Sequence, residues 1–164
     1  MLAVLLVASA AEPPQGPWEA GLRVERQHMR VLGAWSVANL AGGTAGALIA
    51  DGPRARTFHG TNAAWNTVNL GIAAMGAVGV ARGLREPIPN PDTVARRHRQ
   101  LHRVLAVNLA LDVGYMAAGT GLWLAGGQTG PIDHRGAGSA LVVQGAFLAA
   151  FDAIFLARHR RVTR

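Results

Sequence analysis

The chain has 164 residues, a length typical of one domain. Half of the residues are apolar and only 15% are charged, whereas soluble domains carry about 25% charged residues. The absence of cysteine excludes disulfides, iron–sulfur clusters and thiolate zinc sites.

Residues 1–17 combine a short apolar segment with a linker. The stretch MLAVLLVASAAEPP places Ala8-Ser9-Ala10 after an apolar core, as in a signal peptide, but no basic region precedes that core. Two interpretations stay open: a cleaved signal peptide, whose true start would lie upstream, or a segment that rests on the membrane surface.

The predicted membrane domain covers residues 18–164. Its first part, residues 18–30, carries Trp18, Leu22 and Met29 between charges, which predicts a short interfacial helix leading into the first span.

Four windows are long and apolar enough to cross a bilayer, which takes roughly 20 residues at about 1.5 Å each. They cover about 31–50, 60–81, 104–127 and 136–157, and their only charged residues are Asp112 and Asp152. The connections are DGPRARTFHG (51–60), LREPIPNPDT (84–93), predicted to be non-helical because it contains three prolines, and GGQTGPIDHRG (126–136). The sequence therefore predicts an all-α, integral membrane four-helix bundle.

The two halves of this bundle resemble each other. RVLGAWSVANLAGGTAG, from Arg30, and RVLAVNLALDVGYMAAG, from Arg103, align without gaps, and a Gly-Pro turn follows each of them. Two duplicated helix hairpins would explain the match. Chance similarity between short apolar segments explains it equally well.

All sixteen basic residues are arginine, and they are unevenly distributed between the two sides of the predicted spans. Only Arg54, Arg56 and Arg135 fall on one side, and thirteen arginines fall on the other. By the positive-inside rule, the Arg-rich side and both termini should be cytoplasmic, or the reverse if a signal peptide is cleaved. Orientation and anionic lipid headgroups account for the net charge of +7 without a nucleic-acid partner.

Polar residues recur at helical spacing inside the predicted spans, and each set falls on one helix face. Because polar groups are costly in lipid, this face should point inward. Depth along the helices predicts a continuous polar file, made of Asn39, Asn62, Asn66, Asn69, Asn108, Asp112, Tyr115, Gln144 and Asp152. Such a file either ties helices together through hydrogen bonds or forms a path or pocket for a small polar ligand, ion or proton.

Histidines lie at both ends of the predicted bundle. His59 and His134 are candidates for lining an entrance near Asn62, although they are equally typical of ordinary loops. His98 and His102 stand at i and i+4, a spacing that can bind metal. The arginines around them would repel a cation, so we favour a solvated or lipid-facing basic helix there and predict no metal.

Several of these segments together resemble a known family. VLGAWSVANL, FHGTNAAWNTVNLGIA, NLALDVGYMAAG and QGAFLAAFD are similar to an uncharacterised family of small bacterial four-helix membrane proteins, a domain-of-unknown-function family. The resemblance covers residues 28–157. It supports the predicted fold and the interest of the polar face, and it implies no activity.

We therefore expect a multi-pass protein of the bacterial inner membrane with an inward-facing polar site that binds or translocates a small polar ligand, ion or proton. The alternative is a structural or accessory subunit whose buried amides only hold the bundle together. An enzyme that uses Asp112 or Asp152 as acid or base is less favoured. No cofactor motif is present. The expected partners are the lipid bilayer, anionic headgroups at the Arg-rich side, and either a second copy of the chain or a membrane partner protein.

Overall fold

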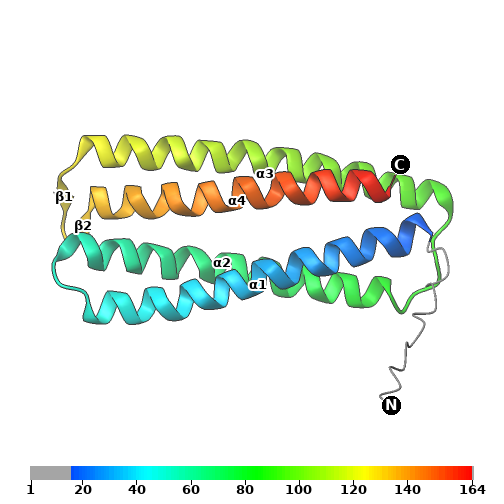
Figure 1. The fold of residues 1–164 in the computed structure, drawn as a ribbon, viewed down its shortest axis with the longest axis horizontal. Coiled ribbons are helices and arrows are strands. Elements are labelled where there is room, and N and C mark those ends of the chain that lie inside the picture. Colours follow the sequence, from blue (N-terminus) through cyan, green and yellow to red (C-terminus); the bar gives the residue numbers. More distant parts are fainter. Residues whose placement is uncertain (1–15, 164) are drawn as a thin grey trace, which may run out of the picture.

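The computed structural model describes residues 16–163 and shows an all-α bundle of four long helices (Figure 1). The helices are α1 (Pro17–Ile49), α2 (Pro53–Gly83), α3 (Pro91–Ala125) and α4 (His134–Val162). Each one is long and apolar enough to cross a membrane, which confirms the predicted fold class and indicates a multi-pass membrane protein. The predicted signal peptide lies outside the described residues.

The helices form two antiparallel hairpins, α1 with α2 and α3 with α4 (Figure 1). The hairpins meet mainly through α4, which packs on α2 and, less extensively, on α1. In residues 16–163, α3 has no comparable contact with α1 or α2. This pairing matches the two predicted hairpins, and their duplication stays a prediction.

The helix that contains the first predicted span, 31–50, begins earlier in the chain than that span, at Pro17. Residues 18–30 do not form a separate interfacial helix, because α1 runs without a break from Pro17 to Ile49. Trp18 and Leu22 are buried, and Leu22 packs over Gly83 of α2. The first turns of α1 are therefore held by packing against protein.

Helix α3 also begins earlier than predicted, at Pro91. The first helical position needs no backbone N–H donor, so proline fits there. The preceding Asn90 caps the helix, since its side chain accepts a hydrogen bond of 2.9 Å from the Thr93 backbone N–H. Only residues 84–90 of the proline-rich stretch are non-helical.

Glycine lets the helices within each hairpin approach closely. In the α3–α4 hairpin, a Cβ on Gly119 would lie 2.7 Å from the Gly138 carbonyl oxygen, and a Cβ on Gly138 would lie 2.8 Å from the Trp123 amide nitrogen. In the α1–α2 hairpin, a Cβ on Gly43 would lie 2.8 Å from the His59 carbonyl oxygen. These contacts are between backbones, so a larger residue would push the helices apart.

The connection between α3 and α4 contains two short antiparallel strands, β1 (Gln128–Thr129) and β2 (Ile132–Asp133). Gly130 in the turn has a φ of 56°, which glycine adopts without steric cost. The hairpin is tied to α2, because the backbone N–H of Asp133 donates to Thr57 Oγ1 at 3.0 Å. We call this end of the bundle the turn end, and the opposite end the Arg-rich end.

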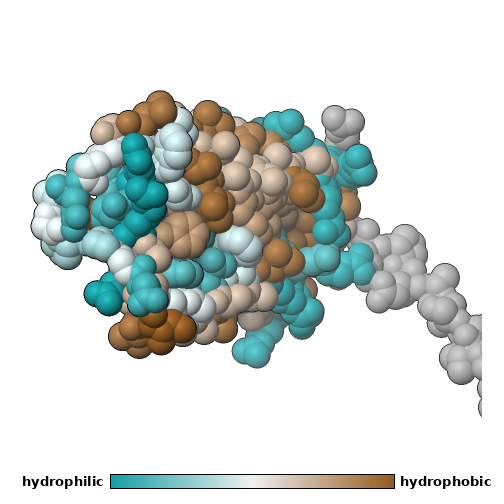
Figure 2. Space-filling model, turned by 60° about the vertical axis from the view of Figure 1, so that its left-hand side comes forward, coloured by the Kyte–Doolittle hydropathy of each residue, from teal (hydrophilic) through white to brown (hydrophobic). Residues whose placement is uncertain are grey.

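Apolar side chains cover the middle of the bundle, and hydrophilic residues gather toward its two ends (Figure 2). Large apolar residues such as Leu48, Val68 and Met75 are at least 64% exposed on the helix surfaces. An apolar band between polar ends is what a bilayer requires of the surface of a spanning bundle.

Candidate functional site

The structure places Gln144 of α4 at the centre of a group of hydrogen-bonded side chains. Gln144 is 1% exposed, and its Nε2 donates to Asn62 Oδ1 at 2.7 Å and to Asn39 Oδ1 at 3.5 Å. Its Oε1 accepts a hydrogen bond of 3.2 Å from Trp35 Nε1. Gln144 thus connects α4 to both helices of the first hairpin.

The other asparagines of α2 extend this group along their own helix. Asn66 Nδ2 donates to the Asn62 carbonyl at 2.9 Å, and Asn69 Nδ2 donates to Asn66 Oδ1 at 3.5 Å. Both asparagines are at most 5% exposed. We call this group the amide cluster; it consists of Trp35, Asn39, Asn62, Asn66, Asn69 and Gln144. Its members mostly satisfy one another, which is the arrangement that stabilises helix contacts in a membrane.

A cavity of about 620 Å³ lies between the two hairpins and is lined by all four helices. Most of its lining is apolar, with residues such as Leu32, Val68, Ile72 and Leu148. A smaller polar part of the lining comprises Glu25, His28, Asn69, Asn108, Asp112, Tyr115 and Asp152. We call it the carboxylate cavity.

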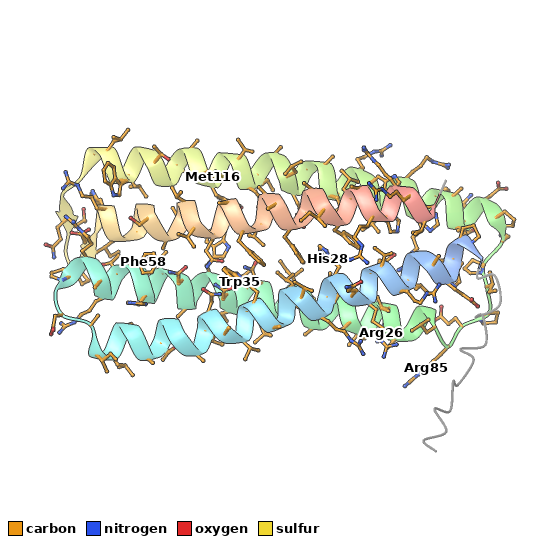
Figure 3. The ribbon with its side chains drawn as sticks, viewed as in Figure 1. Arg26, His28, Trp35, Phe58, Arg85 and Met116 are labelled. Atoms are coloured by element: carbon orange, nitrogen blue, oxygen red, sulfur yellow. The ribbon has the colours of Figure 1, made fainter. Side chains whose placement is uncertain are left out.

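His28 projects from α1 into the space between α1 and α4 (Figure 3). Its ring stacks on Phe151 at 4.0 Å and packs against Phe155 at 3.8 Å between ring centroids. Its Nε2 lies 3.7 Å from Asp152 Oδ1, and within residues 16–163 its buried Nδ1 has no hydrogen-bond partner. Arg26 and Arg85, in contrast, point away from the bundle (Figure 3).

Asp112 is the acidic residue of the cavity that, among residues 16–163, has a buried oxygen without a hydrogen-bond partner. It is 4% exposed, and its Oδ2 is buried without a partner among the described residues. Asp152, on α4, lines the same cavity beside Asn108 and is close enough to Asp112 for the two carboxylates to repel each other. Two neighbouring carboxylates in a poorly solvated site favour a ligand that donates hydrogen bonds or brings positive charge.

The predicted polar file is therefore divided into two parts. The amide cluster binds α1, α2 and α4 together, whereas Asn108, Asp112, Tyr115 and Asp152 face the carboxylate cavity, where Asn69 also contributes to the lining. Tyr115 joins α3 to α2 by an edge-to-face contact with Trp65, with 4.7 Å between ring centroids. His28 is absent from the predicted file, although His28, Trp35 and Asn39 are spaced at i, i+7 and i+11 on one face of α1.

A second group of titratable residues lies at the Arg-rich end. His102 Nε2 and His159 Nδ1 are 3.0 Å apart, and His159 Nε2 lies 3.8 Å from Glu25 Oε1. Arg97 Nη2 donates to Glu25 Oε2 at 2.8 Å. His98 and His159 are 7% and 0% exposed, so the interpretation of a solvated or lipid-facing helix is wrong for this face of α3. The spacing of His98 and His102 along one helix does not reveal that α1 and α4 pack over these rings.

This group predicts a pH dependence of stability. His159 lies beyond the 136–157 window. Burial, together with repulsion from His98, His102 and Arg97, lowers the pKa of its imidazole from 6.5 to about 4. Below pH 6.5 the unfolded chain therefore binds a proton that the folded chain does not, so stability present above pH 6.5 is lost as the pH falls. At pH 5 this linkage amounts to about 2 kcal/mol.

Thermal unfolding of the detergent-solubilised protein should therefore show a lower Tm at pH 5 than at pH 7.5. The variant His159→Gln has no such proton to bind, so its Tm should fall less between the same two pH values. An equal decrease in the wild type and the variant would contradict this assignment.

The remaining predicted positions have local partners. His134 holds the last turn, because its Nδ1 lies 2.7 Å from the Gly126 carbonyl oxygen and its Nε2 lies 2.9 Å from Thr129 Oγ1. His59 lines a separate cavity of about 430 Å³ at the turn end. Across residues 16–163, no group of three or more His, Asp or Glu side chains has a geometry that could hold a metal ion.

The fold and the cavity define a class of protein: a four-helix bundle with helices of membrane-spanning length and a pocket between its two hairpins. Residues 31–153 match a family described as a family of unknown function (DUF6992). The chain belongs to this family, which confirms the resemblance seen in the sequence to an uncharacterised family. No curated protein and no solved structure matches the chain.

Proposed function

We propose that this protein is a membrane-embedded binding protein for a small ligand whose polar group is held by Asp112 and Asp152 in the carboxylate cavity. The observation that carries the proposal is the buried Oδ2 of Asp112, which has no hydrogen-bond partner in residues 16–163, on a residue that lines a cavity of about 620 Å³. Binding sites for small molecules have this character: mostly apolar walls, a few convergent polar groups and volumes of about 300–1,000 Å³.

A structural or accessory role is the second candidate, and the amide cluster favours it. Amides that satisfy one another across three helices account for the stability of the bundle without any ligand. This interpretation leaves Asp112 unexplained, because its buried Oδ2 has no hydrogen-bond partner in residues 16–163 and a carboxylate inside a membrane usually serves a function. We therefore assign the amide cluster to stability and the carboxylates to binding.

The proposed setting is the bacterial inner membrane, with the Arg-rich end in the cytoplasm. The thirteen-to-three distribution of arginines supports this orientation, and it would also attract anionic lipid headgroups to that end. The cavity is formed by the four helices of one chain, so binding does not require a second copy, although self-association through the exposed apolar helix faces is compatible with it.

The proposal predicts that Asp112→Asn weakens ligand retention. A hydrogen bond to a charged group contributes about 1.5–3 kcal/mol, which corresponds to roughly a 10- to 150-fold loss of affinity. Protein purified in mild detergent would be extracted with organic solvent, and compounds present in amounts stoichiometric with the protein would be measured by mass spectrometry. We expect at least one such compound in the wild type and at least tenfold less in the variant.

The matched control is Glu86→Gln, which removes one acidic charge from an exposed residue outside the cavity. It should retain the compound at the wild-type level. If the wild type retains no compound and Asp112→Leu raises the Tm, the Asp112 carboxylate only destabilises the folded protein, and the structural role is the better explanation.

A further inference from the structure

We infer that the ligand of the carboxylate cavity is a lipid-soluble amine that enters from the bilayer between α2 and α3. The inference rests on the proposed binding function and specifies the class of ligand and its route. Three features lead to it: the location of the mouth, the closure of the two ends, and the balance of charge inside.

The mouth of the cavity lies on the side of the bundle. Several residues that line the cavity are also exposed: Val68, Ile72 and Met75 on α2 are 64%, 46% and 70% exposed, and Val104 and Leu111 on α3 are 47% and 49% exposed. All five lie within the apolar windows 60–81 and 104–127. Because α2 and α3 are not packed against each other along their length, the opening between them faces the lipid.

Both ends of the cavity are closed by packed side chains. Toward the turn end, Tyr115 and Trp65 meet edge to face across α3 and α2. Toward the Arg-rich end, Leu105 and Phe155 belong to a buried apolar group that includes Val24 and Leu101. A molecule dissolved in the bilayer therefore has a shorter route to the carboxylates than one dissolved in water at either end.

The charge balance selects a cation. Glu25, Asp112 and Asp152 are the acidic residues of the lining, and no arginine of the described chain lines it. Glu25 is already paired with Arg97 at 2.8 Å, which leaves His28 as the basic neighbour of two carboxylates. A carboxylate with an open acceptor and little water around it binds a charged N–H donor strongly.

The apolar walls then require that this donor be carried on an apolar body. A primary or secondary amine with an alkyl or aromatic tail satisfies both demands, since its ammonium group reaches Asp112 and Asp152 while its tail contacts residues such as Leu32, Ile72 and Leu148. A small hydrated ion would leave these walls unused, and a neutral alcohol would leave the carboxylate charge uncompensated.

Photo-crosslinking with a matched pair of probes tests this inference. One probe is an alkyl amine with a diazirine in its chain, and the other is the alcohol of the same length. Each would be incorporated into nanodiscs that hold the full-length protein at pH 7.5, irradiated, and its attachment sites found by peptide mass spectrometry. We expect the amine to label residues of the cavity lining at least fivefold more than the alcohol does.

Two sets of variants assign the chemistry and the route. Labelling by the amine should fall about tenfold in Asp112→Asn/Asp152→Asn and stay unchanged in Glu86→Gln. Ile72→Trp, at the mouth, should reduce labelling, whereas Val78→Trp, which is 51% exposed on the same helix but does not line the cavity, should not. The Tm of each variant, measured in parallel, verifies that it is folded.

The outcomes separate this inference from the proposed function. Equal labelling of the cavity by amine and alcohol would overturn the amine class while leaving a ligand cavity in place. Full labelling of Ile72→Trp would overturn access between α2 and α3. If neither probe labels the cavity but a different compound is retained through Asp112, the inference fails and the binding function survives. If no compound is retained either, both fail.

Discussion

Gly138→Ala is expected to destabilise the protein by about 2–3 kcal/mol, since forcing extra atoms into a packed contact costs this much. The added Cβ would meet the Gly119 carbonyl oxygen, the Trp123 amide nitrogen at 2.8 Å and the Trp123 Cα at 3.2 Å. All three are backbone atoms of α3, so no side chain can rotate away. Either α4 moves off α3 or the helices lose their regular contact.

The matched control is the same substitution on an open face of α3. Gly121 has no neighbouring atom within 4 Å of an added Cβ. Gly121→Ala should therefore stabilise the helix by about 0.5–1 kcal/mol, because alanine loses less backbone entropy than glycine. Unfolding of both variants in mixed micelles with increasing SDS would measure the two free energies. The close-packed hairpin is refuted if both substitutions shift stability in the same direction.

Gln144→Leu is expected to cost about 2–4 kcal/mol, from the loss of up to three interhelical hydrogen bonds of roughly 0.6–1.7 kcal/mol each. Leucine keeps much of the volume but leaves Trp35 Nε1–H and the Oδ1 atoms of Asn62 and Asn39 without their partner. All three groups belong to buried or half-buried residues, where water cannot easily replace the lost bond.

A double-mutant cycle shows whether this loss is due to the hydrogen bonds. Asn62→Leu should be costly in the wild type and less costly in the Gln144→Leu background, because the partner is already missing. The control Val143→Leu alters a 43% exposed neighbour on α4 and should change stability by less than about 0.5 kcal/mol. Strictly additive effects of the two leucine substitutions would mean that the amide cluster contributes nothing as a unit.

The helices were predictable because length and hydropathy determine them. The windows 60–81 and 136–157 lie within α2 and α4, and the windows 31–50 and 104–127 run only one and two residues past the ends of α1 and α3. Three helices begin several residues earlier than the sequence predicts. The predicted starts of α1 and α3 exclude the charges before residue 31 and the prolines before residue 92, yet packing over Gly83 continues α1 through its charged first turns, and Asn90 with Pro91 makes a favourable N-terminus for α3. Helix α2 begins at Pro53, inside the predicted connection 51–60, where proline again fits the first helical position.

The sequence predicts which polar residues share a helix face, but it does not predict which of them contact each other between helices. Spacing placed Asn62, Asn66 and Asn69 on one side of α2, and all three are buried. Spacing alone could not indicate that Gln144 reaches Asn62 while Asp112 is left with an open acceptor, because this depends on how α4 lies against α2. The same limitation hid His28, whose position beside Asp152 arises only from the contact of α1 with α4.

Helix α3 packs extensively on α4 and contributes no side chain to the amide cluster. The amide cluster fixes α1, α2 and α4 as one unit, and α3 is attached to that unit mainly by its packing on α4, with close glycine contacts near the turn end, and by the Tyr115–Trp65 and Arg97–Glu25 contacts. A small rotation of α3 about the glycine contacts would change its distance from α2 at Ile72 and Leu111. It would break no hydrogen bond of the amide cluster and would act instead on the Tyr115–Trp65 and Arg97–Glu25 contacts. Helix α3 can thus change the width of the opening while α1, α2 and α4 keep their arrangement.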